Sequence, residues 1–228
     1  MNLNKHREFF DPDKFNDEIH IIGCGAVGST IAEQLARLGI KKIHLYDFDT
    51  VSAHNITNQM FFERQIGQEK IIALSDILTM INPNIEIIKH RTGWKEGMPL
   101  SGYVFLAVDN INTRKEIVKD NLFNTNIKAM FDTRMRLTDA QAFAAKWTPE
   151  GKKFLQNTMN FTREEAAAST PVSACGTTLS VTPTVRIICS YVVANLVNTL
   201  LEKPITKTIL IDAFAMTVDA FDDNGLKE

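Results

Sequence analysis

Cysteine is scarce in this sequence of 228 residues, which contains only Cys24, Cys175 and Cys189. Three widely spaced cysteines argue against a disulfide framework and exclude a zinc site built from four cysteines. The histidines offer no substitute, because their spacing along the sequence is not that of metal ligands: His6, His20, His44, His54 and His90. A chain of this length buries about 70–75% of its unfolded surface, so its core needs no covalent or metal cross-link.

The sequence also lacks a surplus of positive charge and a long uninterrupted apolar run. Lysine and arginine number 25 and aspartate and glutamate 27, giving a net charge of −2. A duplex-binding module normally carries a basic excess, so nucleic acid is not expected as the main partner. The longest apolar stretch, residues 181–201, is interrupted by Arg186 and by several asparagines and threonines. It is too polar to span a bilayer, and with no signal-like segment at the N-terminus we expect a cytoplasmic protein without membrane association.

Strand and helix patterns alternate regularly through the first 132 residues. Runs rich in β-forming residues occupy residues 18–22, 42–46, 85–89, 103–108 and 128–132. Helical apolar spacing lies between them, at residues 26–38, 69–81 and 112–122. Such alternation predicts an α/β, Rossmann-like fold with a mostly parallel sheet and helices on both faces.

The pattern changes beyond Arg134. We expect antiparallel strands at the C-terminal end of the sheet, at residues 140–147, 208–211 and 216–220, and a last long helix at residues 183–201. Residues 157–174 show no clean period and are predicted to form a mobile crossover loop, and residues 1–17 are predicted to form an N-terminal arm. Because no repeat or linker is evident, residues 1–228 are predicted to be a single domain.

A glycine-rich turn follows the first strand pattern. Residues 23–28 read Gly-Cys-Gly-Ala-Val-Gly between a strand and a helix, which is typical of a nucleotide-binding turn. Gly23 would allow the tight turn, Gly25 would let a phosphate approach the backbone, and Gly28 would let the helix press against the strand. A purely structural turn without a ligand is the alternative interpretation.

The helix after the turn would present its first N–H groups to a phosphate, from Ala26 and Val27 onwards. Asp47 ends the next strand, and an acid at that place suits hydrogen bonds from ribose hydroxyls. These features fit an NAD-binding protein and an ATP-binding protein equally well.

A longer string of residues distinguishes the ATP-binding interpretation from the NAD-binding one: Asp47, Asp49, Val51, Asn55, Gln59, Gly67, Lys70 and Asp109. This string, with its spacing, resembles the ThiF/MoeB/HesA family, the bacterial relatives of ubiquitin-activating enzymes. The resemblance extends from about residue 21 to residue 132 and continues more weakly through the last helix. It implies a ThiF-type adenylation domain of Rossmann-like fold over the whole chain, in a form without the family's zinc-binding cysteine pairs.

The resemblance implies an ATP-dependent adenylyltransferase that uses Mg²⁺. Its substrate would be the C-terminal glycine of a ubiquitin-like or sulfur-carrier protein or peptide, and its products an acyl-adenylate and pyrophosphate. Lys70 would bind phosphate oxygens, Asp109 would hold Mg²⁺, and Asp47 would bind ribose. Asn55 and Gln59 would contact phosphate or hold the loop. A homodimer is implied as well.

Each role has a plainer alternative. Lys70 would otherwise be a solvated helix residue, Asp109 the N-cap of the following helix, and Asp49 a turn former. Asn55 would otherwise only stabilise its own loop.

The sequence departs from the family pattern at Asn58, where the family has arginine immediately before the residue equivalent to Gln59. A cation is therefore missing from the expected nucleotide-contacting position. We hypothesise that Arg64 replaces it, and the alternative is an ordinary surface arginine. The departure leaves a non-catalytic nucleotide-binding partner subunit as an alternative function, and the glycine turn leaves an NAD-dependent oxidoreductase as another.

Cys175 lies at the junction between the expected mobile loop and the last helix. Some members of the family carry a thiol here that bonds to the activated carrier, so the resemblance makes Cys175 a candidate nucleophile; thiolates are strong nucleophiles near neutral pH. A buried or unreactive loop thiol is the alternative. Cys24 and Cys189 are predicted to pack as small core residues.

Overall fold

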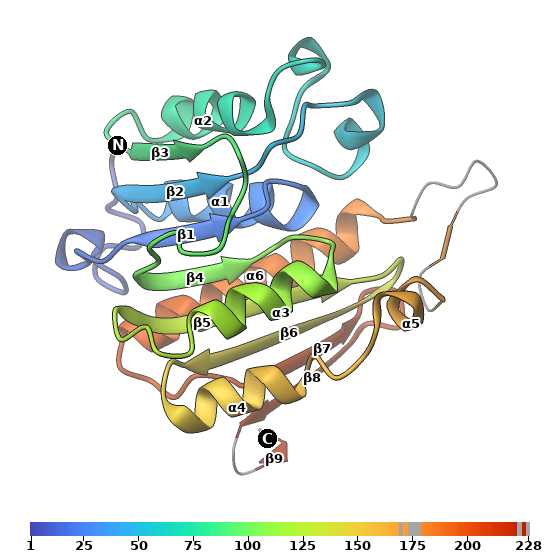
Figure 1. The fold of residues 1–228 in the computed structure, drawn as a ribbon. Coiled ribbons are helices and arrows are strands. Elements are labelled where there is room, and N and C mark those ends of the chain that lie inside the picture. The colour runs from blue at the N-terminus through green and yellow to red at the C-terminus, as the bar shows by residue number, and fades with distance from the viewer. Residues whose placement is uncertain (169–170, 173–178, 223–224, 227–228) are drawn as a thin grey trace.

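One mixed sheet organises the computed structural model, which describes residues 1–168, 171–172, 179–222 and 225–226 (Figure 1). Within the described residues the strand order is β3-β2-β1-β4-β5-β6-β7-β8-β9. The first five strands run parallel: β1 (Ile19–Ile22), β2 (Lys42–Tyr46), β3 (Glu86–His90), β4 (Gly102–Leu106) and β5 (Ile127–Met135). The others are antiparallel: β6 (Asp139–Lys146), β7 (Thr208–Asp212), β8 (Thr217–Asp222) and β9 (Gly225–Leu226). The predicted fold class is confirmed.

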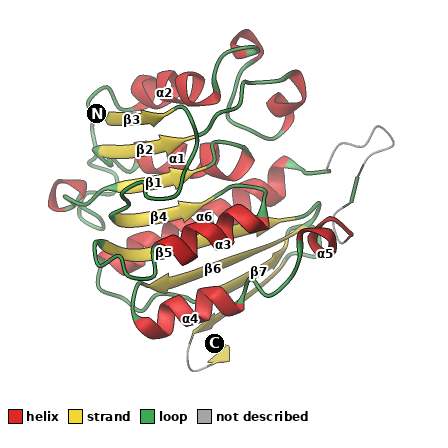
Figure 2. Cartoon of the chain, in the orientation of Figure 1, coloured by secondary structure: helices red, strands yellow, loops and turns green. Residues whose placement is uncertain are grey.

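Helices cover both faces of the sheet (Figure 2). One face carries α1 (Ala26–Arg37), α2 (Lys70–Ile81) and α6 (Thr182–Leu200). The other carries α3 (Ile111–Asp120) and α4 (Pro149–Asn157). The described residues also form three short 3-10 helices: η1 (Pro12–Lys14), η2 (Ala53–Thr57) and η3 (Glu63–Gln65). In the described part of the chain, no helix combines the length and apolarity that a bilayer crossing requires.

The central strands are buried on both faces, as their continuous apolar sequences require. All five residues of β4 are buried. Phe105 points into the larger core with α1, α2 and α6, and its neighbours Val104 and Leu106 point into the core under α3 and α4. The alternation of side chains along a strand therefore builds two cores from one apolar run.

The expectation of a loop over residues 157–174 is wrong in part, because Arg163–Ala168 forms the short helix α5. Thr162 Oγ1 accepts a hydrogen bond from the Glu165 backbone N–H, and a Glu165 carboxylate oxygen accepts one from the Thr162 N–H. This reciprocal capping box stabilises the first turn. Residues 169–170 and 173–178 of that segment lie outside the described residues.

Helix α4 was not expected from the sequence either. Thr148 caps its N-terminus by accepting a hydrogen bond from the Gly151 N–H, and Pro149 follows at the first helical position. The N-terminal arm packs on the body of the protein, since Phe10 and Phe15 both belong to the larger core.

We predict that Phe131→Ala lowers the free energy of unfolding by about 3–5 kcal/mol, the usual cost of emptying a buried phenylalanine site. The Phe131 ring is buried and stacks on Phe105 with centroids 4.9 Å apart. Phe123→Ala is the matched control, because Phe123 is 94% exposed, and its effect should stay within about 0.5 kcal/mol. Urea unfolding of both variants measures the difference, and equal effects would contradict the described core.

Candidate functional site

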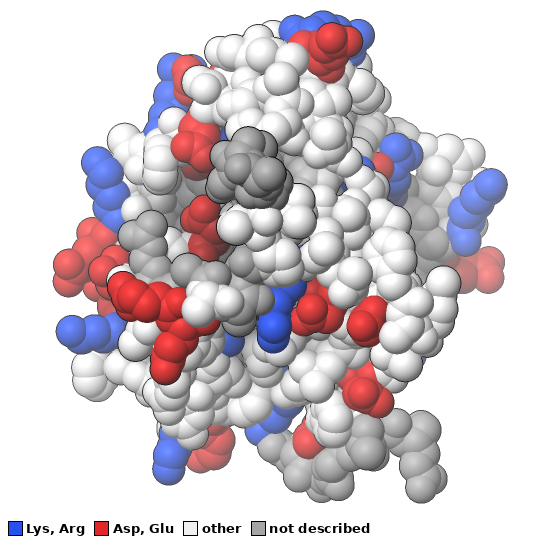
Figure 3. Space-filling view, turned by 90° about the vertical axis from the view of Figure 1, so that its right-hand side faces the viewer, with Lys and Arg blue, Asp and Glu red and all other residues white. Residues whose placement is uncertain are grey.

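The parallel strands end at a large cleft. β1 lies between β2 and β4, so the chain connections on the two sides of β1 lead in opposite directions across the sheet. Open α/β sheets bind ligands at such a switch point. A cleft of about 1840 Å³ opens beyond the carboxyl ends of these strands. Figure 3 views the molecule from this side, and the acidic and basic side chains drawn on it are interspersed.

The glycine turn forms one wall of the cleft with the geometry that the motif predicts. Gly23 has φ +98°, a conformation that favours glycine, and a Cβ there would lie 2.7 Å from the Ala107 carbonyl oxygen. A Cβ on Gly28 would lie 1.8 Å from the Gly23 carbonyl oxygen. The turn therefore joins the ends of β1 and β4 to the first turn of α1 at backbone contact distance.

The N-terminus of α1 faces the cleft. Gly25, Ala26 and Val27 line it, and no side chain in the described residues caps this helix end. A Cβ built on Gly25 would meet nothing within 4 Å, so the backbone is open to a close ligand. Uncapped N–H groups and the helix dipole together favour an anion at this place.

Asp47 holds the turn in addition to lining the cleft. Its carboxylate accepts hydrogen bonds from the Cys24 N–H at 2.6 Å and the Asp49 N–H at 2.8 Å. Burial raises the pKa of Asp47, and these two hydrogen bonds and the nearby Lys70 oppose the increase. Each carboxylate oxygen keeps a lone pair that can accept a further hydrogen bond from a ligand hydroxyl.

Lys70 is buried and paired, so the alternative of a solvated helix residue is wrong. It opens α2 and is only 7% exposed, and its Nζ lies 2.8 Å from the Asp49 carboxylate. Asp49 is therefore more than a turn former, because it holds the lysine amine at the edge of the cleft. Both residues line the cleft beside Asp47.

Asn55, Asn58 and Gln59 all line the cleft, but their side chains have different hydrogen-bond partners. Asn55 Oδ1 accepts a hydrogen bond from the Ser52 N–H at 2.9 Å, so Asn55 stabilises its own loop. Asn58 Nδ2 donates to Ser180 Oγ at 2.8 Å and ties this loop to the segment before α6. Gln59 lines the cleft, and its Oε1 is buried without a hydrogen-bond partner in the described structure.

Asp109 does not cap α3, which corrects the second alternative. Asn110 is the N-cap, and its side chain accepts a hydrogen bond from the Asn112 N–H. Asp109 is exposed and lines the cleft. It therefore presents a carboxylate to the cleft, two residues after Ala107, which meets the glycine turn.

A buried charged cluster, which no sequence motif indicated, contributes Arg114 and Arg134 to the wall of the cleft. The Asp132 carboxylate is fully buried and accepts hydrogen bonds from Arg114 and Arg134. Arg114 also donates to the carbonyl oxygens of Leu106 and Thr133 at 3.0 Å. The signal was present in the sequence, since an acid and an arginine two residues apart interrupt an otherwise apolar central strand.

Three residues of the cleft carry buried polar atoms that have no partner among the described residues: Gln59 Oε1, Trp94 Nε1 and Thr133 Oγ1. An unpaired buried polar group costs free energy, and natural proteins avoid it unless a ligand or water supplies the partner. The cleft therefore offers three polar atoms whose hydrogen bonds a ligand or water can complete. No sequence motif indicates Trp94 or Thr133 as site residues.

The structure does not bring Arg64 to the cleft. Arg64 is exposed on η3 and lies over the Phe62 ring, with Cζ 5.4 Å from the ring centroid. It is absent from the cleft-lining residues of the described structure, so the hypothesis that it replaces the lost cation finds no geometric support. Cys175, the candidate nucleophile, lies outside the described residues.

Residues 13–226 match the ThiF family model. The chain therefore belongs to the ThiF family.

Similar proteins include ubiquitin-like modifier-activating enzyme 5 of Dictyostelium discoideum, 39% identical over 120 residues, which cover 45% of this chain and 31% of the relative. The same enzyme of Drosophila persimilis is 40% identical over 126 residues, covering 55% and 27%. The chain thus spans about a third or less of the curated relatives it matches.

Among solved structures, E. coli MccB superposes with a TM-score of 0.72 at 17% identity, covering 92% of this chain and 65% of MccB. PaaA gives a TM-score of 0.67 at 16% identity, covering 93% and 65%. These two likenesses show the fold.

We predict that iodoacetamide leaves Cys24 and Cys189 unmodified in the native protein at neutral pH. Both thiols are buried, and burial raises the pKa of each, so neither forms the reactive thiolate. Peptide mass spectrometry before and after unfolding in guanidinium measures the labelling. Modification of Cys24 in the native protein at its unfolded rate would contradict this placement.

Proposed function

We propose that this chain is an ATP-dependent adenylyltransferase that activates the C-terminal carboxylate of a ubiquitin-like or sulfur-carrier protein or peptide. The products would be an acyl-adenylate and pyrophosphate. The observation that carries the proposal is a single cleft onto which the glycine turn, the uncapped N-terminus of α1 and the paired Lys70 all face.

Family membership and the named relatives support this activity. The curated relatives are named as ubiquitin-like modifier-activating enzymes. E. coli MccB was crystallised with ATP and with MccA. For this chain, the same sources support a ubiquitin-like protein or a peptide as the partner, and we propose that the chain acts as a homodimer.

The phosphates of ATP would lie over Gly25 and the first N–H groups of α1, where backbone donors and the helix dipole favour negative charge. Lys70 would leave Asp49, or share its amine between Asp49 and a phosphate oxygen. Asp47 would accept hydrogen bonds from the ribose hydroxyls. The partnerless polar atoms of Gln59, Trp94 and Thr133 are consistent with a polar ligand of this size.

The walls of the cleft also fit a bound Mg²⁺. Asp109 offers an exposed carboxylate there, and Mg²⁺ prefers carboxylate and phosphate oxygens as ligands. When bound, Mg²⁺ would neutralise charge on the phosphate oxygens. The attacking carboxylate would enter along the part of the cleft that is lined by Arg136, just after β5, and by Gln141 on β6.

We predict that Lys70→Ala lowers ATP–pyrophosphate exchange by about 10²–10³-fold, the usual loss when one positioned charge-stabilising group is removed. Exchange is measured with Mg²⁺ and a panel of carriers that end in Gly-Gly. Lys128→Ala is the matched control, because Lys128 also pairs with an aspartate at 2.8 Å but lies outside the cleft. It should leave exchange unchanged.

Other outcomes discriminate between the functions. A native chain that Mg·ATP stabilises against heat, but that supports no exchange with any carrier, would favour a non-catalytic partner subunit; a ligand that binds only the native state raises its stability. Stabilisation by NAD(H) and not by Mg·ATP would reject adenylyl transfer in favour of oxidoreduction. Wild-type exchange in Lys70→Ala would remove Lys70 from the site.

We predict that Arg64→Ala leaves ATP–pyrophosphate exchange at the wild-type rate, because Arg64 projects from η3 toward Phe62 and away from the cleft. The same assay serves, with Lys70→Ala as the positive control for a loss. A fall in exchange comparable with that of Lys70→Ala would show that Arg64 moves into the site during the reaction.

A further inference from the structure

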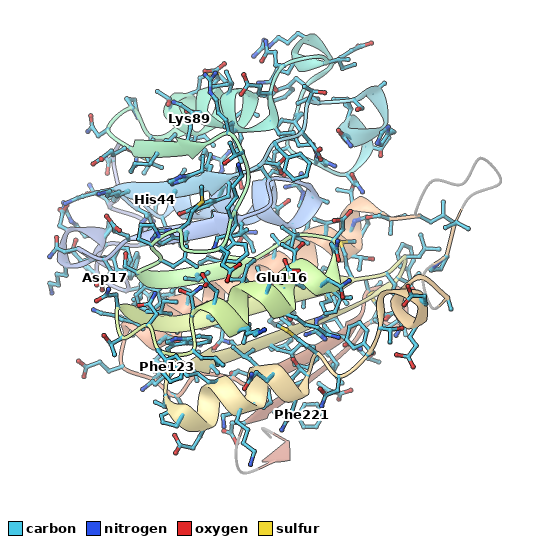
Figure 4. All side chains as sticks on the ribbon, viewed as in Figure 1. Asp17, His44, Lys89, Glu116, Phe123 and Phe221 are labelled. Carbon is cyan, nitrogen blue, oxygen red and sulfur yellow. The ribbon has the colours of Figure 1, made fainter. Side chains whose placement is uncertain are left out.

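Three large apolar side chains are exposed on the hairpin that joins β7 to β8. Phe214 is 59% exposed, Met216 87% and Val218 46%. These three residues, which fall within five positions of the sequence, form the hairpin patch. Single exposed apolar residues are normal in a folded protein, but a group of them is typical of an interaction site. Figure 4 shows where β8 lies, with Phe221 labelled on it near the edge of the sheet.

The turn of this hairpin is held by hydrogen bonds to its backbone. The Asp212 carboxylate accepts hydrogen bonds from the Phe214 N–H at 3.0 Å and from the Ala215 N–H at 2.9 Å. The Ala213 N–H donates to the Thr138 carbonyl oxygen at 2.8 Å. The hairpin patch therefore projects from an ordered turn, and a partner that binds it would not have to order this backbone first.

The hairpin patch lies at the end of the sheet where the cleft opens. Ala140 on β6 stands opposite Ile211 on β7, and Ile211 stands opposite Val218 on β8. Ala140 lines the cleft, so the patch begins two strand spacings from the cleft wall, or about 10 Å. This is the part of the cleft through which the attacking carboxylate would enter.

The two strands of the hairpin carry negative charge only. Residues 208–222 contain no lysine or arginine but include three aspartates: Asp212, Asp219 and Asp222. On the neighbouring β5–β6 turn, Arg136 is paired with Asp139 at 3.3 Å. An apolar patch with an acidic rim complements a partner that carries lysine or arginine around an apolar surface of its own.

The same charge pattern disfavours a second copy of the chain as the occupant of the patch. Two copies that met through their β8 strands would bring Asp219 of each copy toward the aspartates of the other. Like charges across an interface weaken association, and no basic residue of these two strands would compensate them. The acidic rim therefore favours a different, basic partner.

The sheet also sets the distance between the hairpin patch and the glycine turn. Five strand spacings separate β1, which leads into the glycine turn, from β8, and they amount to about 24 Å. An extended chain covers about 3.3–3.6 Å per residue, so about seven residues would reach from the patch to a phosphate over Gly25. A folded protein with a flexible C-terminal tail of that length would contact both places at once.

We propose that the hairpin patch docks the folded body of the carrier protein while the carrier's C-terminal tail lies along the cleft. This inference rests on the proposed function and narrows its substrate from a protein or peptide to a folded protein with a basic rim around an apolar surface. The body would supply binding free energy that the tail alone lacks. Docking and adenylyl transfer would then depend on different residues, Phe214 and Met216 for docking and Lys70 for the reaction.

ATP–pyrophosphate exchange tests the proposal with two forms of one substrate. One is a folded ubiquitin-like protein that ends in Gly-Gly, and the other is a synthetic peptide of its last seven residues. The double variant Phe214→Ser/Met216→Asn removes two apolar side chains of the patch, and asparagine tolerates the φ of +59° at position 216. We expect the KM for the folded carrier to rise at least about tenfold, the change that a loss of about 1.4 kcal/mol produces. The kcat, the KM for ATP and the reaction of the peptide should stay unchanged.

Two further variants complete the experiment. Met80→Asn is the matched control, because Met80 is an exposed methionine on α2 and is not among the described residues that line the cleft; it should leave both substrates unaffected. Asp219→Lys reverses one charge of the rim without altering the turn, and it should also raise the KM for the folded carrier alone. Melting curves show whether each variant folds.

The outcomes separate the docking role from the proposed function. Absence of exchange by the wild type with every carrier rejects the proposed function and this inference with it. Exchange by the wild type, with an unchanged KM for the folded carrier in the double variant and in Asp219→Lys, overturns the docking role alone. An equal loss with the seven-residue peptide also overturns it, because the variants would then act on the cleft. A change in oligomeric state, measured by light scattering, would assign the patch to a second copy instead.

Discussion

The buried carboxylate of Asp132 is the interaction on which the architecture around the cleft depends. It accepts hydrogen bonds from Arg114 on α3 and from Arg134 at the end of β5. Arg114 reaches the end of β4, and Arg134 reaches Thr158 at the end of α4. Removing one partner of such a buried pair typically costs about 3–5 kcal/mol, because the remaining charge is left uncompensated. The Asp132 carboxylate thus holds β4, β5, α3 and the end of α4 in place beside the cleft.

Most of the fold could be predicted because it depends on local patterns. Apolar runs, glycines and helical spacing indicated the parallel half of the sheet, its helices and the antiparallel strands that follow. The misses have a common cause. Helices α4 and α5 are short, and each begins at a threonine cap, Thr148 and Thr162, instead of following a long apolar stripe.

The site was predictable to the extent that its residues follow strand ends. Asp47 and Asp109 both line the cleft because they follow the carboxyl ends of β2 and β4, and Lys70 at the start of α2 joins them through its ion pair with Asp49. Contacts between strands that are distant in the sequence were not predictable. The Asp132 ion pairs, the Thr133 hydroxyl that has no partner in the described part of the chain, and the stacking of His20 on His44 all depend on which strands become neighbours. Residue spacing along the chain does not contain that information.

The close contact between Gly28 and the Gly23 carbonyl oxygen has a consequence for ligand binding. A turn fixed by backbone contacts on two sides loses its conformational entropy when the protein folds, not when the ligand arrives. An anion over Gly25 therefore meets donors that are already oriented, and little of its binding free energy is spent on ordering them. A larger side chain at either glycine would separate α1 from β1 and make the turn adaptable, at the expense of affinity.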